Sequence, residues 1–280
     1  MRELNGRTAI VTGASAGIGA AVARELSAHG MQVVLAARSV DKLEQLAAEL
    51  RHAGRTAVAV PTDVADATAR EHLISRTTEE FGAIDLLVNN AGIESFSIYH
   101  KLEVDRIIRC LDVNLTAALV LTRLALPHMI DAGRGHIINM SSTAGQHGPA
   151  YGAAYGASKA GLIAFTESLR AEYHGTGVSA SVICPGFTRS GGIYDEIEQR
   201  IGRGTPLQMG GTSARAVARA VIRAIRSDLP EIIVNRPPMR PIFTLCAACP
   251  RLGEWIARIA TARFLKRVAT SRDREAARGK

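Results

Sequence analysis

The sequence predicts an α/β fold, in which a doubly wound, parallel sheet of seven strands carries helices on both faces and a C-terminal helical extension follows. Two observations support this. Short apolar runs alternate with longer segments of helical periodicity, which is typical of βαβ units. A glycine-rich turn follows the first apolar run and leads directly into a helix, as in the dinucleotide-binding (Rossmann) type of this fold. The chain has 280 residues, 47% of them hydrophobic, which suits one large domain with a buried core.

The predicted elements alternate along the chain up to about residue 235. We expect strands over residues 8–12, 32–37, 56–60, 84–89, 136–141, 178–183 and 231–234. We expect helices over residues 17–29, 41–53, 66–81, 103–131, 152–174 and 213–227. Because parallel strands need crossover connections, this order predicts a single sheet covered on both of its faces.

The first turn, Gly13-Ala14-Ser15-Ala16-Gly17-Ile18-Gly19, is a candidate phosphate site. The first backbone N–H groups of a helix lack acceptors within the helix, and the helix dipole favours negative charge at that end. Glycine lets a pyrophosphate approach the backbone and adopts the dihedral angles that such a turn needs. The spacing is G-x-x-x-G-x-G, and a purely structural glycine turn is the alternative interpretation.

The end of the second strand predicts which nucleotide binds. A carboxylate at this place binds the 2′-hydroxyl of the adenine ribose, whereas a basic side chain can pair with a 2′-phosphate. The strand ends in Ala37, and Arg38 and Ser39 follow. The sequence therefore favours NADP(H) over NAD(H), with a solvated surface arginine as the alternative.

The next two strands end in polar residues. Asp63 and Val64 follow the third strand, where Asp63 either accepts a hydrogen bond from an adenine amino group or caps the helix that begins near Asp66. Asn89-Asn90-Ala91-Gly92 ends the fourth strand. Ligands bind at the carboxyl ends of parallel strands, so these residues are candidates for the same site; the alternative is that the asparagines only form a turn.

Four polar residues farther along form a candidate catalytic site. Tyr155 and Lys159 lie on one face of a helix, where the ammonium would favour the phenolate and lower the pKa of the tyrosine. Ser142 ends the fifth strand and is placed to donate a hydrogen bond to a substrate oxygen. Asn114 is a polar residue in an otherwise apolar helix, either a satisfied core group or the holder of a water molecule.

Six motifs, in this order, resemble the short-chain dehydrogenase/reductase family. They are T-G-x-x-x-G-x-G at residues 12–19, N-N-A-G at 89–92, Asn114, Ser142, Tyr155-x-x-x-Lys159 and Pro185-Gly186. The resemblance covers about residues 5 to 235 and is closest to the branch with a single Rossmann domain.

The resemblance implies a reaction and a role for each catalytic residue. Tyr155 would act as general acid toward a ketone or as general base toward an alcohol, and Ser142 would hydrogen-bond the substrate oxygen. Lys159 would lower the pKa of Tyr155 and hold the nicotinamide ribose. Asn114 would position a water between Lys159 and solvent.

The resemblance also implies which residues hold the cofactor. The loop after the sixth strand would lie by the nicotinamide carboxamide, where Ser190 stands at the place of a common threonine and Thr188 is a second candidate. The family often has a base just before the second glycine; here Ala16 stands there, so selectivity for the 2′-phosphate would depend mainly on Arg38. The full predicted set is Gly13, Ser15, Ala16, Gly17, Ile18, Gly19, Arg38, Ser39, Asp63, Val64, Asn90, Ala91, Gly92, Tyr155, Lys159, Pro185, Gly186, Thr188 and Ser190.

The chain divides into a body and an extension. We expect residues 1–235 to form the NADP-binding domain with the catalytic site, including a glycine-rich substrate lid over about residues 187–211. In residues 236–280, Leu252, Trp255, Ile256 and Ile259 mark an apolar helical stripe. Residues 251–280 hold nine Lys or Arg and three Asp or Glu, so most of the net charge of +8 lies there. Residues 270–280 are expected to be disordered.

Two interpretations of the extension stay open. It packs on the body or on a second subunit and caps the substrate cleft, or it lies on an anionic membrane surface. Nucleic-acid contact is not expected, because no recognised module and no interleaved aromatic residues accompany the charge. The family resemblance implies a homodimer or homotetramer formed through the fifth and sixth helices.

Composition narrows the class of protein further. No apolar run reaches the length of a membrane span, and the first residues lack the apolar core of a secretory signal. The four cysteines make no disulfide framework, and the lone C-x-x-C at Cys246 and Cys249 lacks a second pair, so no metal site is expected. We expect a cytoplasmic protein, with membrane association as the alternative.

These observations lead to one expected function and one alternative. We expect an NADP(H)-dependent carbonyl reductase or alcohol dehydrogenase that acts on an apolar small molecule, such as a lipid-like, acyl or polycyclic compound. The alternative is a regulatory or scaffold protein that binds a dinucleotide but has lost turnover. The presence of all four catalytic candidates argues against that alternative.

Overall fold

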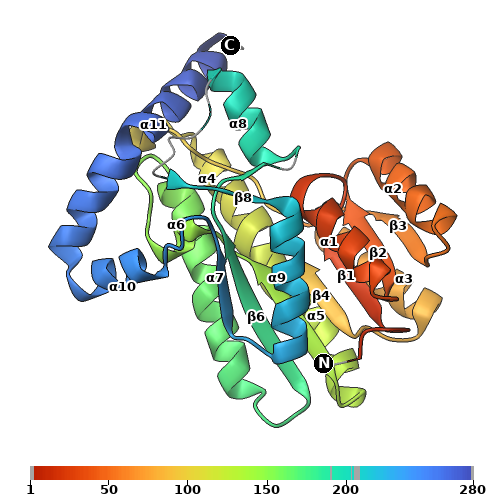
Figure 1. Cartoon of the computed structure of the whole chain (residues 1–280). Helices are drawn as coiled ribbons and strands as arrows, with labels where there is room; N and C mark the ends of the chain where they lie inside the picture. The colour runs from red at the N-terminus through yellow and green to blue at the C-terminus, as the bar shows by residue number, and fades with distance from the viewer. Residues whose placement is uncertain (1–2, 190, 203, 205–208, 279–280) are drawn as a thin grey trace.

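A seven-stranded parallel sheet forms the centre of the molecule. The computed structural model describes residues 3–189, 191–202, 204 and 209–278 (Figure 1). The strand order is β3-β2-β1-β4-β5-β6-β9, and every neighbouring pair is parallel. The strands are β1 (Thr8–Thr12), β2 (Gln32–Ala37), β3 (Ala57–Pro61), β4 (Leu86–Asn89), β5 (Gly135–Met140), β6 (Val178–Pro185) and β9 (Glu231–Val234). The predicted fold class is confirmed, and the order reverses between β1 and β4, where such sheets bind ligands.

Helices cover both faces of the sheet. One buried cluster joins the strands to α1 (Gly17–Ala28), α2 (Val40–His52) and α9 (Ala214–Ser227). A second cluster on the opposite face joins them to α3 (Ala67–Phe81), α5 (Ala117–Asp131) and α7 (Ala153–Glu172). Along β1 the side chains alternate between the two clusters, Ala9 and Val11 on one face and Ile10 on the other. The strands read as continuous apolar runs because both of their faces are buried.

The predicted helix over 103–131 is divided. It comprises α4 (Val104–Leu111), a π-helical turn η2 (Asp112–Thr116) and α5. Asn114 lies in the π turn, where the wider spacing of hydrogen bonds changes the direction of side chains relative to a regular helix. Hydrophobic periodicity does not reveal such a turn, because apolar residues continue on both sides of it.

The segment after β6, for which the sequence predicts a lid and which we call the lid, is held at both ends by strand pairing. Strand β7 (Thr188–Arg189) pairs with β8 (Thr212–Ser213), and the helix α8 (Ile193–Ile201) lies between them. The α8 side chains Tyr194 and Ile197 are buried, as is Met209 beyond the helix.

The C-terminal extension consists of two helices that fold back over the same end of the molecule. They are α10 (Arg240–Ala248) and α11 (Pro250–Arg278), at the left and top of Figure 1. Phe264, Leu265 and Val268 of α11 are buried against the lid residue Ile197. The expected disorder beyond residue 270 is wrong for the described part of the chain, since α11 continues to Arg278. Among the described residues, none of the helices has the length and apolar character needed to cross a membrane.

One carboxylate joins the extension to the body. Glu94, in the loop after β4, forms ion pairs with Arg200 of α8 and with Arg272 of α11. A third guanidinium, that of Arg106 in α4, donates to the backbone carbonyl of Glu94 at 3.2 Å. The exposed fractions of the Glu94, Arg200 and Arg272 side chains are only 11%, 15% and 19%. Loop, lid and extension therefore share one largely buried ionic contact.

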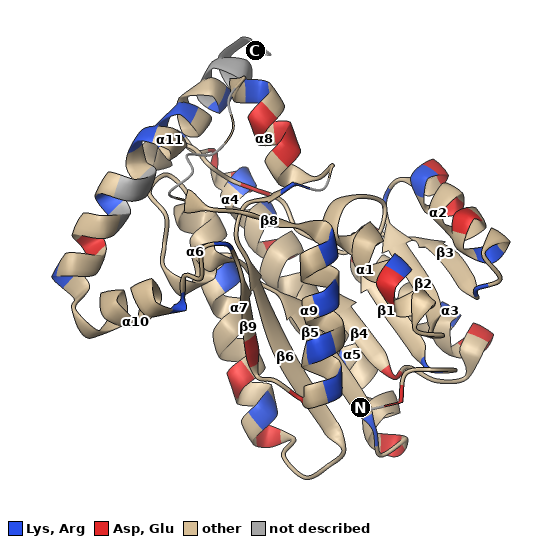
Figure 2. Ribbon diagram, viewed as in Figure 1, with Lys and Arg blue, Asp and Glu red and all other residues tan. Residues whose placement is uncertain are grey.

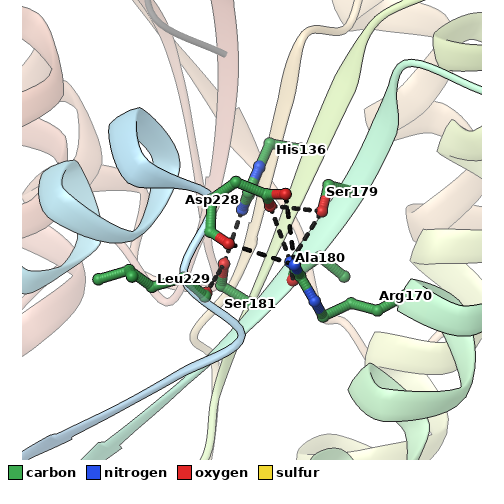
Figure 3. A network of polar contacts seen from close by, with 7 residues as sticks. All are labelled: His136, Arg170, Ser179, Ala180, Ser181, Asp228 and Leu229. Atoms are coloured by element: carbon green, nitrogen blue, oxygen red, sulfur yellow. Dashed lines mark hydrogen bonds and ion pairs between the residues drawn. The ribbon is translucent and has the colours of Figure 1, made fainter. Parts of the chain in front are cut away.

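A polar network holds β5, β6 and the start of β9 together at the amino ends of these strands, away from the carboxyl ends (Figure 3). Arg170 of α7 donates to Asp228 Oδ1 at 2.8 Å and to Ser179 Oγ at 2.8 Å. Ser181 Oγ donates to the carbonyl oxygen of Leu229 at 2.6 Å. His136 Nε2 lies 2.8 Å from Ser181 Oγ, and since that hydroxyl already donates elsewhere, His136 is the donor.

Candidate active site

A cleft of about 700 Å³ runs along the carboxyl ends of the strands. It begins at the glycine-rich turn, passes the ends of β2, β3 and β4, and ends beneath the lid and the extension. The predicted site residues that line it are Gly13, Ser15, Ala16, Gly17, Ile18, Gly19, Arg38, Ser39, Asp63, Val64, Asn90, Ala91, Gly92, Ser142, Tyr155, Lys159, Pro185, Gly186 and Thr188. Asn114 lies behind the cleft wall, and Ser190 lies outside the described residues.

The glycine turn has the backbone geometry of a phosphate cradle. Gly13 and Gly17 have φ values of +67° and +62°, which side chains with a Cβ rarely adopt. A Cβ at Gly19 would collide with the carbonyl oxygen of Gly13, so this position also requires glycine. Helix α1 starts at Gly17, its N-cap residue Ala16 offers no capping oxygen, and its first turn has no acidic residue. The first N–H groups of α1 therefore remain available to an anion.

Asn90 holds this turn in place. Its Nδ2 donates to the carbonyl oxygen of Thr12 at 2.8 Å, and its backbone N–H donates to Thr12 Oγ1 at 2.9 Å. The neighbouring Asn89 points into the core, where its Nδ2 donates to Asn139 Oδ1 at 3.0 Å and to Thr122 Oγ1 at 3.1 Å. The two asparagines thus have different roles, and Asn90 is the one that borders the cleft.

The end of β2 presents basic groups to the cleft. Arg38 and Ser39 line it, both exposed, as the sequence predicts for residues that meet the adenine ribose. Lys42, in the first turn of α2, lines the same part of the cleft and is not among the predicted residues. Its place in the cleft follows from the packing of the first turn of α2 beside the end of β2, which no motif in the sequence marks.

Asp63 does not cap the following helix. Asp66 does so, with its Oδ1 accepting from the Ala69 N–H at 2.7 Å. Asp63 accepts from the Ala65 N–H at 3.0 Å and pairs with Arg109 Nη2 at 2.7 Å. Burial opposes the charge of Asp63, but the hydrogen bonds of Arg109 and Ala65 and the nearby cations outweigh it, so the pKa of Asp63 lies below its usual value. The carboxylate is therefore ionised beside the cleft.

The candidate catalytic residues meet at the other end of the cleft. Tyr155 and Lys159 lie one turn apart on α7, with Lys159 Nζ 5.8 Å from the centroid of the tyrosine ring. Lys159 Nζ is buried and donates to the carbonyl oxygen of Met140 at 2.9 Å. Ser142 is the N-cap of α6 (Thr143–Gln146), where its Oγ accepts from the Ala144 N–H at 3.1 Å, and its hydroxyl lies near enough to that of Tyr155 to act on the pKa of the phenol.

Burial dominates the proton affinities of this pair. Removal from water raises the pKa of Tyr155, and the hydrogen bond to Ser142 opposes only part of that rise. Burial lowers the pKa of Lys159 to about 8. The expectation that Lys159 lowers the pKa of Tyr155 is therefore not met in this structure, because desolvation disfavours the phenolate more than the neighbouring groups favour it.

Asn114 is fully hydrogen-bonded within the protein. Its Oδ1 accepts from the Ile93 N–H at 2.8 Å, and its Nδ2 donates to the Ile93 carbonyl at 3.0 Å and to Ser158 Oγ at 3.1 Å. A Cβ on Gly92 would lie 3.3 Å from Asn114 Oδ1 and 3.4 Å from Lys159 Nζ. Asn114 therefore fixes the loop after β4 against α7 close to Lys159.

The lid and the extension enclose the catalytic end with apolar side chains. From the body and the lid come Phe96, Phe187, Tyr194, Ile197 and Met209. The extension adds Met239, Ile242, Phe243, Cys246, Ile256 and Leu265, which corresponds to the capping interpretation. His147, just after α6, is a polar residue of this end that sequence analysis did not single out.

Comparison with known proteins agrees with this geometry. A family model for the short chain dehydrogenases matches residues 7–200. The ketoacyl reductase HetN of Nostoc sp. is 39% identical over 247 residues, which is 87% of this chain and 84% of that protein. A metagenomic short-chain oxidoreductase, solved in complex with NADP, has 34% identity and a TM-score of 0.71, with 83% of this chain and 98% of that chain covered. A short chain dehydrogenase/reductase from Burkholderia phymatum, solved in complex with NAD, has 26% identity and a TM-score of 0.81, with 90% and 97% covered.

Proposed function

The chain belongs to the short-chain dehydrogenase/reductase family, and we propose that it is an NADP(H)-dependent oxidoreductase that interconverts a carbonyl compound and a secondary alcohol. The observation that carries the proposal is one continuous cleft, with the glycine-rich turn at one end and Ser142, Tyr155 and Lys159 at the other. A dinucleotide needs such a span between its adenine and its nicotinamide.

The residues of the cleft fit NADP(H). Gly13, Gly17 and the N-terminus of α1 would hold the pyrophosphate, and Arg38 with Lys42 would pair with the 2′-phosphate. The remaining predicted residues would contact the other parts of the cofactor: Ser15, Ala16, Ile18, Gly19, Ser39, Asp63, Val64, Asn90, Ala91, Gly92, Tyr155, Lys159, Pro185, Gly186, Thr188 and Ser190. A relative from Burkholderia phymatum was solved in complex with NAD, so the preference proposed for this chain depends on Arg38 and Lys42 rather than on the fold.

The catalytic residues would handle the proton. When bound, the nicotinamide supplies or accepts the hydride. The raised pKa keeps Tyr155 protonated at neutral pH, the form that donates a proton to a carbonyl oxygen during reduction. Ser142 would donate a hydrogen bond to the same oxygen as negative charge develops on it. Lys159 would hold the nicotinamide ribose and stabilise the phenolate, and Asn114 would contribute by fixing the loop after β4 against α7 close to Lys159.

An apolar substrate suits the enclosed end of the cleft. Aromatic and aliphatic side chains of the lid and the extension supply most of its walls. An acyl substrate is one member of this class, and the name of the Nostoc relative supports it. The proposal treats residues 1–235 as the NADP-binding domain, with the lid over about 187–211, and residues 236–280 as the extension.

We further propose a cytoplasmic homodimer or homotetramer. Val104 and Ile108 of α4 are 67% and 51% exposed, on the helical stretch through which the family resemblance implies association. Burial of such side chains between subunits would remove apolar surface from water.

Replacing Tyr155 tests the catalytic proposal. In Tyr155→Phe the proton donor is lost, and turnover of ketones with NADPH should fall at least about a hundredfold. The exposed Tyr99→Phe is the matched control and should keep wild-type turnover. A dinucleotide-binding regulator would show NADPH binding but no turnover in the wild type, across a panel of aliphatic, acyl and polycyclic ketones. That result would contradict the proposed function.

Replacing Arg38 tests the cofactor proposal. Arg38→Asp removes a cation from the 2′-phosphate and offers a carboxylate to a ribose hydroxyl. The ratio of kcat/KM for NADPH to that for NADH should fall roughly tenfold to a hundredfold. Arg55→Asp, at an exposed arginine outside the cleft, should leave the ratio unchanged. An unchanged ratio in Arg38→Asp would remove this residue from the phosphate site.

A further inference from the structure

The outer side of the extension exposes large apolar side chains. On α10, Leu245 is 44% exposed. On the first half of α11, Leu252, Trp255 and Ile259 are 38%, 57% and 62% exposed. We call these four residues the outer patch. In the part of the chain that the structure describes, nothing covers them.

The two helices hold the outer patch as one surface. A Cβ on Gly253 would lie 2.9 Å from Cys246 Cβ, so the glycine allows α11 to pack closely against α10. Leu252, Trp255 and Ile259 follow one another at spacings of three and four residues, which places them along one face of α11. The patch is thus a contiguous apolar face rather than a set of scattered side chains.

Basic side chains flank the α11 part of this patch. Arg251 and Arg258 are exposed and lie within one turn of Trp255, and Glu254 is the nearby acid. Figure 2 shows basic residues continuing along α11 beyond them. Residues 251–280 contain nine Lys or Arg and three Asp or Glu. A second copy of this chain would bring like charge against like charge at this surface, whereas an anionic lipid surface would attract it.

We propose that the outer patch docks on an anionic lipid bilayer. Trp255 would lie at the level of the lipid headgroups, since its ring combines an apolar body with a polar N–H. Leu245 and Ile259 would enter the boundary of the acyl chains, while Arg251 and Arg258 pair with lipid phosphates. The helices would lie along the surface.

This docking gives the extension a second role, which rests on the proposed function. The inner side of the same two helices, including Phe243, Cys246 and Ile256, lines the catalytic end of the cleft. Docking of the outer patch therefore brings the roof of the substrate cleft to the lipid. The substrate class is thereby narrowed to carbonyl or alcohol compounds that partition into a membrane.

The single tryptophan offers a direct test, because Trp255 is the only one in the chain and lies in the outer patch. Full-length protein is titrated with vesicles of phosphatidylcholine containing phosphatidylglycerol, and with vesicles of phosphatidylcholine alone. On the mixed vesicles the tryptophan emission should shift to shorter wavelength and be quenched by lipids brominated in the acyl chain. Because electrostatic attraction is screened by salt, affinity should fall at high ionic strength.

Variants separate the apolar and the charged contributions. Vesicle affinity, measured by co-sedimentation, should fall roughly tenfold in Ile259→Gln and roughly fivefold in Arg258→Gln. Val40→Gln, which changes an apolar residue that is 50% exposed on α2, is the matched control and should bind vesicles like the wild type. Circular dichroism of each variant verifies that the fold is kept.

Two results would overturn the proposal. One is an emission of Trp255 that stays unchanged on mixed vesicles while the protein is folded. The other is an emission already shifted without vesicles that depends on protein concentration, which would assign the patch to a second copy. Turnover of a small water-soluble ketone, measured in parallel, reports on the proposed function separately, because neither Trp255 nor Ile259 lines the cleft.

Discussion

At the scale of single residues, burial controls the chemistry of the candidate site. Tyr155 and Lys159 are both removed from water, so the pKa of the phenol rises and that of the ammonium falls to about 8. The two groups are thus both in their protonated forms at neutral pH. A protonated Tyr155 can donate a proton during reduction. We therefore expect activity to change with pH on the alkaline side of neutrality.

The pH dependence of reduction should follow Lys159. Its pKa is lowered from 10.5 to about 8, so its charge is present below pH 8 and is lost as the pH rises through that value. We expect kcat/KM for ketone reduction to be flat from about pH 6 to 7.5 and to fall above about pH 8, as the loss of the cation removes stabilisation of the phenolate.

Substitutions identify the titrating group. In Lys159→Arg the guanidinium does not titrate, so the residual activity should lose the inflection near pH 8. Lys42→Gln, which changes the other lysine of the cleft, should keep it. An inflection that persists in Lys159→Arg would assign the titration to another group.

The sequence predicts a residue of the candidate site where a local rule requires that residue type. It does not predict a residue that reaches the cleft only because the fold packs it there. The glycines at 13, 17 and 19 follow from backbone geometry, and Arg38 follows from its place after a strand. Lys42 and His147 reach the cleft through the packing of α2 and of the loop after α6, and no motif marks them. The direction of the Tyr155 pKa was missed because burial depends on the whole fold.

At the scale of elements, the sequence predicts the main sheet but not the irregular or short elements around it. Apolar runs of strand length predicted all seven strands of the main sheet within a few residues. The π turn at Asn114 and the short pair β7–β8 arise from tertiary contacts that leave no periodic signal. The helix α10 was not predicted as a separate element, because the apolar stripe of the extension marks only the residues of α11.

The network of Figure 3 gives an element-scale prediction for stability. Burial lowers the pKa of His136 from 6.5 to about 3. Below pH 6.5 the unfolded chain therefore binds a proton at this residue that the folded chain does not bind. The contribution of His136 to the free energy of unfolding should be fully present above about pH 6.5. It should decrease by about 1.4 kcal/mol per pH unit as the pH falls below that value.

Urea unfolding at several pH values measures this contribution of His136 to stability. Between about pH 7.5 and pH 5, the free energy of unfolding of the wild type should fall by about 2 kcal/mol more than that of His136→Gln, which has no titrating ring. The comparison cancels the other titrating groups, which both proteins share. Equal pH slopes would show that His136 is not the group responsible.

At the scale of the whole molecule, the extension completes the cleft. The body supplies the sheet, the glycine-rich turn and the candidate catalytic residues, whereas α10 and α11 supply part of the enclosing apolar wall. Sequence analysis left two interpretations of this extension, because an apolar stripe predicts burial without specifying a partner. Its inner and outer sides now have separate surroundings, the cleft on one side and solvent on the other.

The shared contact at Glu94 should govern how firmly this wall closes. Glu94→Gln keeps the shape of the side chain but leaves Arg200 and Arg272 without their carboxylate in a largely buried place. Breaking such a pair should lower the free energy of unfolding by about 3 kcal/mol. Glu44→Gln breaks the exposed ion pair with Arg51 and should change it by less than about 1 kcal/mol.

The same variant should alter catalysis selectively. When lid and extension lose their common anchor, a bulky apolar ketone loses part of its enclosure, so its KM should rise while kcat changes little. A small water-soluble ketone, which needs less of that wall, should be reduced with nearly unchanged kcat/KM. Limited proteolysis should at the same time cleave α11 faster in Glu94→Gln than in Glu44→Gln, because the helix opens more often. If both variants gave equal stability and equal cleavage rates, the extension would be held by its apolar contacts with α8 alone, and Glu94 would have no part in closing the cleft.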